Sequence, residues 1–475
     1  MMVRIKKMGL ASPATQSPPY WTPAGENGRD SDMTHAPPAL SRRTLLAGLG
    51  GTILVPSLAS WTPSPAAAQG RPSLALRAGA GTLALAPGTP TPAWLLSGAD
   101  EILRFKQGDE IDISLQNDLP VPVALMWRGL GGIARAEPLL GRPPMAAGGK
   151  DAFRLPLRHA GTELLDARLL GDGQALPSPA RACVVQEAAP PEVDRDEVWL
   201  IEDFRLRADG TAIAPGSDPK DAATLFTING KPTLDLAARI NERLRIRIIN
   251  GCQRSVIALR IEDQEIRVMA MDGQPAEPFL ARNSQLVLAP GTRIDAFIDI
   301  TKPAGTTSGL MLHDGKQART IGKLVVSGEA PARDRALPPP APLPSNGLPA
   351  RLDLKSAQRI DLTIGGAAAA KPEWVKPAGI TASAPAFRVK PGRVVVLALT
   401  NRDNTAAVFH LHGHPFRLLD RLDDGWKPYW LDTLALEAGQ TQRIAFLAEY
   451  PGRWGMEAFA TAWAAPRLMR WFEVA

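Results

Sequence analysis

The segment that decides the fold is residues 392–401, which read GRVVVLALTN. The same pattern occurs at residues 108–117, GDEIDISLQN, and at residues 241–250, NERLRIRIIN. Each copy starts with a turn residue, continues with an alternating strand pattern and ends with Asn. Alternation of period two predicts a strand with one buried and one exposed face. Three copies in one chain indicate an internal structural repeat.

A second signal recurs after each copy, and it runs from a turn to a Phe. It occupies residues 147–153, 290–297 and 438–446. No long pattern of helical period interrupts the units. Apolar residues make up 45% of the chain, and the 42 Gly and 45 Pro suit many short strands and turns. The sequence therefore predicts an all-β fold of three antiparallel β-sandwiches in tandem.

The positions of the repeats predict the limits of the three domains. We expect the first domain at residues 71–190, the second at 191–328 and the third at 351–475. Residues 329–350 join the last two domains. They contain the run PPPAPLP at residues 338–344, which predicts an extended, semi-rigid linker.

The first 68 residues have the pattern of an export signal. Residues 41–46 read SRRTLL, an apolar stretch of small residues follows to position 59, and residues 65–68 read PAAA, an Ala-x-Ala cleavage pattern. This predicts export by the twin-arginine route to the periplasm. A membrane anchor is the alternative, but the apolar stretch is short and rich in Gly and Pro, so no stable span is expected after cleavage.

Charge and cysteine content exclude several classes of protein. After residue 68, 48 Lys and Arg face 45 Asp and Glu, and no dense basic run is present, so nucleic acid is not an expected partner. The two cysteines, Cys183 and Cys252, are far apart in the sequence. They allow no disulfide framework and are expected to be buried free thiols.

Other motifs resemble those of the three-domain multicopper oxidases of the cupredoxin fold. In the second domain these are FTING at residues 226–230 and MDGQP at 271–275, and in the third HLHGHPF at 410–416 and PGRW at 451–454. The resemblance implies three cupredoxin-like Greek-key β-sandwiches. It also implies two copper centres: a type 1 copper bound by Cys and two His, and a trinuclear cluster held by eight His that reduces dioxygen.

The resemblance also assigns positions to the copper ligands, and most of them hold other residues. His410 and His412 match cluster ligands and could form a residual metal site. The other aligned cluster positions hold Met126, Arg128, Asp166, Arg168, Glu457 and Phe459. The type 1 positions hold Ala407, Ala458 and Trp463, with Leu468 at the axial position, where Leu is tolerated. Thiolate and imidazole are the ligands that such copper requires.

The repeat supports this alignment without the family. In the first and third units, the paired cluster positions lie nine and eleven residues after the repeat Asn, which aligns Met126 with His410 and Arg128 with His412. Asp166 and Glu457 each lie five residues after an aligned Gly. We therefore expect these positions to meet, with Arg128 and Arg168 supplying positive charge. At least one of the two should hydrogen-bond Glu457 between the first and third domains.

These observations favour a non-enzymatic periplasmic protein, similar to the copper-free FtsP/SufI-like members of the superfamily that are associated with cell division. A copper-dependent oxidoreductase is one alternative. A copper-handling protein is another, using His410, His412 and His414, which alternate and so should share a face. No catalytic residue and no cofactor is expected, although homology leaves copper open. The expected partners are periplasmic or envelope proteins, and the chain is expected to be a monomer.

Overall fold

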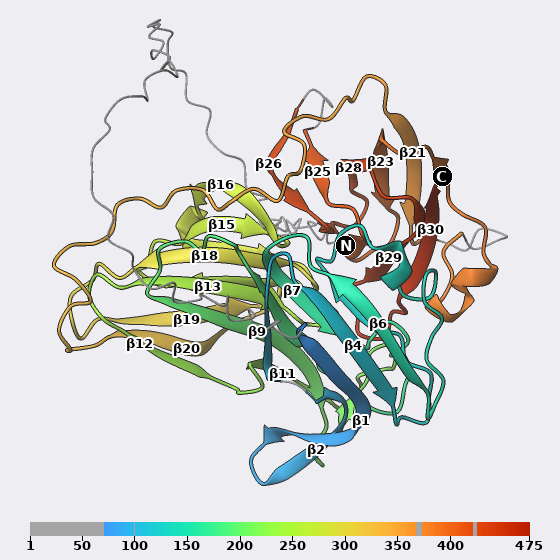
Figure 1. Cartoon of the computed structure of the whole chain (residues 1–475). Helices are drawn as coiled ribbons and strands as arrows, with labels where there is room; N and C mark the ends of the chain where they lie inside the picture. Colours follow the sequence, from blue (N-terminus) through green and yellow to red (C-terminus); the bar gives the residue numbers. More distant parts are fainter. Residues whose placement is uncertain (1–70, 99, 367–372, 421–424) are drawn as a thin grey trace, which may run out of the picture. The chain divides into compact units, whose positions relative to one another are not determined.

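The computed structural model describes residues 71–98, 100–366, 373–420 and 425–475, and their regular structure is almost entirely β-strand (Figure 1). The predicted export signal, residues 1–68, lies outside the described residues. Within the described ranges there are three short 3-10 helices, η1 (Ala134–Ala136), η2 (Arg282–Ser284) and η3 (Pro377–Ala382). In the same ranges no helix is long and apolar enough to span a membrane.

The first pair of sheets is built from strands between residues 73 and 186. One sheet has the order β2-β1-β4-β6, with β1 (Ser73–Ala86), β2 (Thr89–Ser97), β4 (Glu110–Asn117) and β6 (Lys150–Pro156). The other has the order β3-β8-β7-β5, with β3 (Ile102–Lys106), β5 (Met126–Arg128), β7 (Gly161–Asp166) and β8 (Arg181–Gln186). Leu76, Ile111 and Leu165 are buried in the core that the two sheets share.

The second pair is built from strands between residues 195 and 326. One sheet has the order β10-β9-β13-β18-β15-β16, and β11 also pairs with β9. Its strands are β9 (Arg195–Leu206), β10 (Ala212–Ile213), β11 (Ala223–Ile228), β13 (Arg243–Asn250), β15 (Arg267–Met271), β16 (Gln274–Leu280) and β18 (Arg293–Asp299). The other has the order β12-β20-β19-β14-β17, with β12 (Leu234–Ala238), β14 (Ile257–Ile261), β17 (Gln285–Leu288), β19 (Thr307–His313) and β20 (Ala318–Val326).

The third pair, orange to red in Figure 1, is built from strands between residues 358 and 474. One sheet has the order β21-β23-β28-β25-β26, with β21 (Gln358–Ile364), β23 (Arg393–Asn401), β25 (Phe416–Leu419), β26 (Trp426–Leu431) and β28 (Thr441–Ala448). The other has the order β22-β30-β29-β24-β27, with β22 (Arg388–Val389), β24 (Ala407–Leu411), β27 (Thr433–Leu436), β29 (Gly452–Ala460) and β30 (Leu468–Val474).

The prediction of three β-sandwiches in tandem is confirmed, but the sheets are mixed and not purely antiparallel. β1 is parallel to β4, β9 to β13 and β21 to β23. Parallel neighbours need a crossover connection, and in each domain the chain visits other strands before it returns. Alternation along a strand shows which face is buried but not the direction of its neighbour. The exact limits of the domains stay a prediction.

The Asn that ends each repeat motif has the same role in all three domains. The buried side-chain amides of Asn117, Asn250 and Asn401 each donate to a backbone oxygen in the loop that follows their own strand, β4, β13 or β23. Each also donates to one or two backbone oxygens of the segment that leads into the neighbouring antiparallel strand, β6, β18 or β28. Their side-chain oxygens each accept a backbone N–H two residues further on. A buried loop needs such partners, because its backbone polar groups are out of reach of water. The alternating residues of each repeat motif therefore form a strand, and its final Asn provides hydrogen bonds to backbone groups outside that strand.

Candidate functional site

Four strands, β5, β7, β24 and β29, carry most of the positions that the resemblance assigns to a copper cluster. β5 holds Met126 and Arg128 and pairs with β7, where Met126 lies opposite Asp166. β24 pairs with β29, where His410 lies opposite Glu457. The two registers agree, so the alignment of the first and third units that their repeats predicted is confirmed.

Glu457 lies at the centre of the group and is completely buried. Nη2 of Arg128, from the first domain, donates to both carboxylate oxygens of Glu457, at 3.0 and 3.1 Å. Arg467 also donates to this carboxylate, and Nε2 of His412 lies 2.9 Å from it. Burial alone would raise the pKa of Glu457, but the guanidiniums of Arg128 and Arg467 outweigh burial and hold that pKa well below its usual range. The predicted hydrogen bond between the first and third domains is confirmed.

His412 is held between two carboxylates. Its Nδ1 lies 2.6 Å from Oε1 of Glu137, and its Nε2 contacts Glu457. Because ionised carboxylates only accept hydrogen bonds, both ring nitrogens donate, and the ring is an imidazolium. Burial alone would lower the pKa of His412, but Glu137 and Glu457 outweigh burial and raise it to about 9. Sequence reasoning missed Glu137, which follows η1 in a loop that carries no repeat signal.

The surroundings of His410 are different. Its Nδ1 lies 3.0 Å from the backbone oxygen of Asp432 and 3.0 Å from Oγ1 of Thr433. Burial, together with the charge of Arg128, lowers the pKa of His410 to about 4, so this ring is neutral at pH 7. Asp432 is fixed in turn by Arg293, whose two terminal nitrogens donate to its carboxylate at 2.9 and 2.7 Å. Two neighbouring histidines therefore carry different charges.

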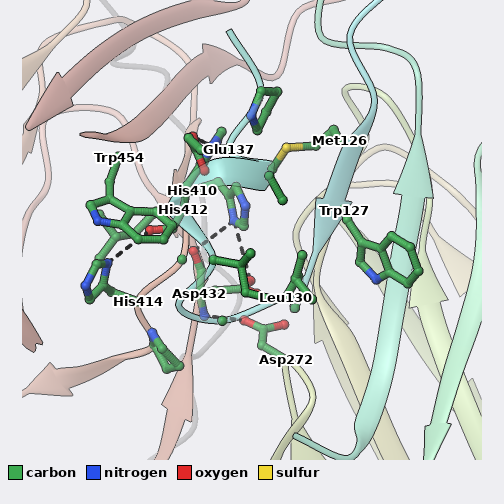
Figure 2. A pocket seen from close by; sticks show the side chains of 18 of the residues that line it. Met126, Trp127, Leu130, Glu137, Asp272, His410, His412, His414, Asp432 and Trp454 are labelled. Atoms are coloured by element: carbon green, nitrogen blue, oxygen red, sulfur yellow. Dashed lines mark hydrogen bonds and ion pairs between the residues drawn. The ribbon is translucent and has the colours of Figure 1, made fainter. Parts of the chain in front are cut away.

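Ligand atoms of His410, His412 and Glu457 lie within 4.8 Å of one another, which makes these residues a candidate metal-binding group. A cavity of about 40 Å³ lies beside His410 and His412, with room for a few water molecules. Figure 2 shows the residues that line it, which include Met126, Glu137, Asp272, His410, His412 and Asp432. Met126 is a buried part of the wall.

Arg168 does not reach this group, so the expectation that it supplies charge there is wrong. Its guanidinium donates to Glu202 of the second domain and to two backbone oxygens. The reason is local, because β7 ends at Asp166 and Arg168 lies in the loop after it. The backbone N–H of Arg168 donates to Oδ1 of Asp166, and its side chain points to the second domain. The second guanidinium of the group is that of Arg467, from the loop between β29 and β30, which also lies 4.9 Å from the ring centre of Phe459.

Apolar side chains fill the positions that the resemblance assigns to type 1 copper. Ala407 and Ala458 are buried in the core of the third domain, and Leu468 packs against that core. Trp463 is also buried, with its ring centre 4.3 Å from the guanidinium carbon of Arg205 in the second domain. Trp offers only an N–H donor, and Ala and Leu offer no polar atom. None of these four side chains provides a lone pair that suits copper.

His414 lines the same cavity as His410 and His412 but is not part of the group that they form with Glu457. β24 ends at Leu411, and Gly413, with a φ of +69°, turns the backbone between His412 and His414. The ring of His414 instead contacts the aromatic rings of Phe446, Tyr450, Trp454 and Phe472. Burial lowers its pKa to about 3. Figure 2 shows it beside Trp454, and it is a neutral residue of the core.

Sequence comparisons identify relatives of this chain. Two family models, both described as multicopper oxidase, match residues 200–307 and 351–475. The multicopper oxidase MmcO of Mycobacterium tuberculosis is 24% identical over 411 residues, which cover 75% of this chain and 77% of that protein. Laccase-7 of Arabidopsis thaliana is 24% identical over 248 residues, which cover 46% of this chain and 42% of that protein.

Solved structures extend the similarity to most of the described chain. A multicopper oxidase from Pseudomonas thermotolerans superposes with a TM-score of 0.72 at 25% identity, over 85% of this chain and 99% of that one. Lac15, from a marine microbial metagenome, superposes with a TM-score of 0.69 at 24% identity, over 85% of this chain and 100% of that one. Matching family models, relatives and domain structure lead to one conclusion: this chain is a member of the multicopper oxidase family with cupredoxin-like domains.

Proposed function

We propose that this protein is a non-catalytic member of its family, which is exported to the periplasm and acts there through contacts with envelope proteins. The chemistry of the type 1 positions carries the proposal. Copper of this kind needs a thiolate and two imidazoles, and Ala407, Ala458 and Trp463 supply neither. The two cysteines of the chain, Cys183 and Cys252, are buried in the first and second domains. Burial raises their pKa values well above the ordinary range, which opposes thiolate formation.

A copper ion also does not fit the group formed by His410, His412 and Glu457. Both nitrogens of His412 are used as donors to carboxylates, so neither has a lone pair for a metal. Glu457 accepts from Arg128 and Arg467, whose fixed positive charges oppose a cation at the same place. Only His410 remains as a neutral imidazole. One imidazole is too small a ligand set for a transition metal in competition with these ion pairs.

Export by the twin-arginine route is part of the same proposal and rests on residues 41–68 of the sequence. This route suits a chain that folds before transport. The association with cell division rests on the resemblance to the copper-free FtsP/SufI-like members of the superfamily. Multicopper oxidase activity, which the names of the relatives describe, is the alternative to this proposal.

A copper reconstitution experiment tests the proposal. The protein is purified from the periplasm, incubated with excess Cu(I) or Cu(II) and desalted, and a laccase sample treated in the same way serves as the positive control. We expect no blue thiolate absorbance and no copper-dependent oxygen uptake with phenols, ferrous ions or cuprous ions. Either signal would refute the proposal. Tightly bound copper without colour or oxygen uptake would favour the copper-handling alternative.

A further inference from the structure

We infer that Asp172, Arg254 and Arg467 form a three-domain lock, in which one ion pair and the hydrogen bonds around it hold all three domains together at one junction without a metal. Asp172 lies in the first domain between β7 and β8, Arg254 follows β13 in the second, and Arg467 precedes β30 in the third. The inference goes beyond the proposed function, because it concerns what fixes the arrangement of the domains and not whether the protein is catalytic.

One carboxylate oxygen is shared by both partner domains. Oδ2 of Asp172 accepts a hydrogen bond from Nη2 of Arg254 at 2.7 Å, and it also accepts the backbone N–H of Arg467. Nη2 of Arg254 donates in addition to the backbone oxygen of Ala465 at 3.0 Å. Arg254 is completely buried. The second domain therefore contacts the first and the third through a single guanidinium.

Each of the two guanidiniums at the junction has a carboxylate partner, from another domain for Arg254 and from the same domain for Arg467. The guanidinium carbons of Arg254 and Arg467 lie 4.8 and 4.9 Å from the ring centre of Phe459, so both cations rest against one aromatic side chain. Arg467 donates to Glu457, and Arg254 donates to Asp172. Asp172 is thus the carboxylate partner of Arg254, whereas Arg467 shares Glu457 with Arg128 and His412. Removing one carboxylate leaves a buried charge without a partner, which is costly.

Backbone hydrogen bonds connect the same three domains at this place. The N–H of Gly173 in the first domain donates to the backbone oxygen of Pro215 in the second, at 2.7 Å. The N–H of Gly216 then donates to the backbone oxygen of Trp463 in the third, at 2.8 Å. A Cβ at Gly216 would lie 2.9 Å from the Cβ of Asp172, and its φ is +80°, so Gly suits this close approach. The lock is therefore built from main chain as well as side chains.

Limited proteolysis of the mature protein tests the lock, with cleavage followed at residues 187–194 and 329–350, which connect the strands of successive domains. Asp172→Asn keeps the shape of the side chain but removes its charge. We expect cleavage in these segments to be at least about tenfold faster than in the unmodified protein. A matched control is Asp314→Asn, since Asp314 pairs with Arg319 at 2.7 Å within the second domain. This control should leave inter-domain cleavage unchanged.

A milder variant keeps the test decisive if Asp172→Asn fails to fold. Arg254→Lys retains the positive charge but cannot serve Asp172 and Ala465 together with one planar group. We expect it to increase inter-domain cleavage as well, in the presence or absence of a copper chelator. Cleavage by either folded variant at the rate of the unmodified protein would overturn the lock, and so would protection of the unmodified protein that depends on added copper. Failure of the proposed function would appear separately, as copper-dependent oxygen uptake.

Discussion

Replacing Glu457 with Gln is predicted to lower the free energy of unfolding by about 3–5 kcal/mol, the usual cost of breaking a buried ion pair from one side. The side chain keeps its size, so packing is conserved. What is lost is the negative charge that Arg128, Arg467 and His412 share. Glu457 is completely buried, so water cannot replace the missing charge.

Urea unfolding followed by tryptophan fluorescence measures this effect. With a slope of about 2 kcal/mol per molar urea, the transition that includes the third domain should shift down by roughly 2 M. The matched control is Glu473→Gln, which removes the partner of Arg388 from an ion pair whose arginine is 70% exposed. An exposed pair contributes less than about 1 kcal/mol, so the control should shift the midpoint by well under 1 M. Equal shifts in the two variants would mean that the charge of Glu457 contributes no more than an exposed ion pair.

Three further predictions concern other parts of the chain. Burial raises the pKa of Glu163 to about 8, against an ordinary value of 4.5, so the folded protein holds a proton that the unfolded chain releases between these pH values. The free energy of unfolding should therefore fall as pH rises from 4.5 to 8, by at most roughly 1.4 kcal/mol per pH unit. Glu163→Gln still offers Trp127 an acceptor, and in urea titrations at several pH values it should abolish this part of the fall. Asn401→Ala should cost about 3 kcal/mol in the same assay, because several backbone groups lose a buried partner, and a cost under about 1 kcal/mol would contradict the role given to these hydrogen bonds. Exchanging both Arg42 and Arg43 for Lys should retain the precursor in the cytoplasm, as cell fractionation would show, since Lys lacks the planar guanidinium; normal periplasmic delivery would rule out the twin-arginine route.

The repeated strand was predictable because its cause is local. Alternation along residues 392–401 indicates the buried face of β23. Asn401, at its end, donates a hydrogen bond to the backbone of the loop that follows. The same repeat aligned Met126 with His410 and Arg128 with His412. The strand registers agree, since Met126 pairs with Asp166 as His410 pairs with Glu457. Parallel pairing was not predictable, because it depends on where the chain crosses between sheets.

The partners of the site were less predictable, because they lie in loops. Glu137, Asp172 and Arg467 have no periodic signal, and their roles depend on contacts between residues far apart in sequence. Arg168 was assigned to the site by its spacing, but the turn after β7 directs it to Glu202. A strand pattern fixes the direction of a side chain only as far as the strand extends.

We propose that ion pairs around Glu457 take the place of a copper cluster in this protein. The most direct test is a crystal structure of the mature protein grown with excess copper, with anomalous diffraction recorded at the copper edge. We predict no anomalous peak between His410 and His412, and an intact contact between Arg128 and both oxygens of Glu457, as at 3.0 and 3.1 Å here. A copper peak within bonding distance of either histidine, with the Arg128 guanidinium displaced, would contradict the account.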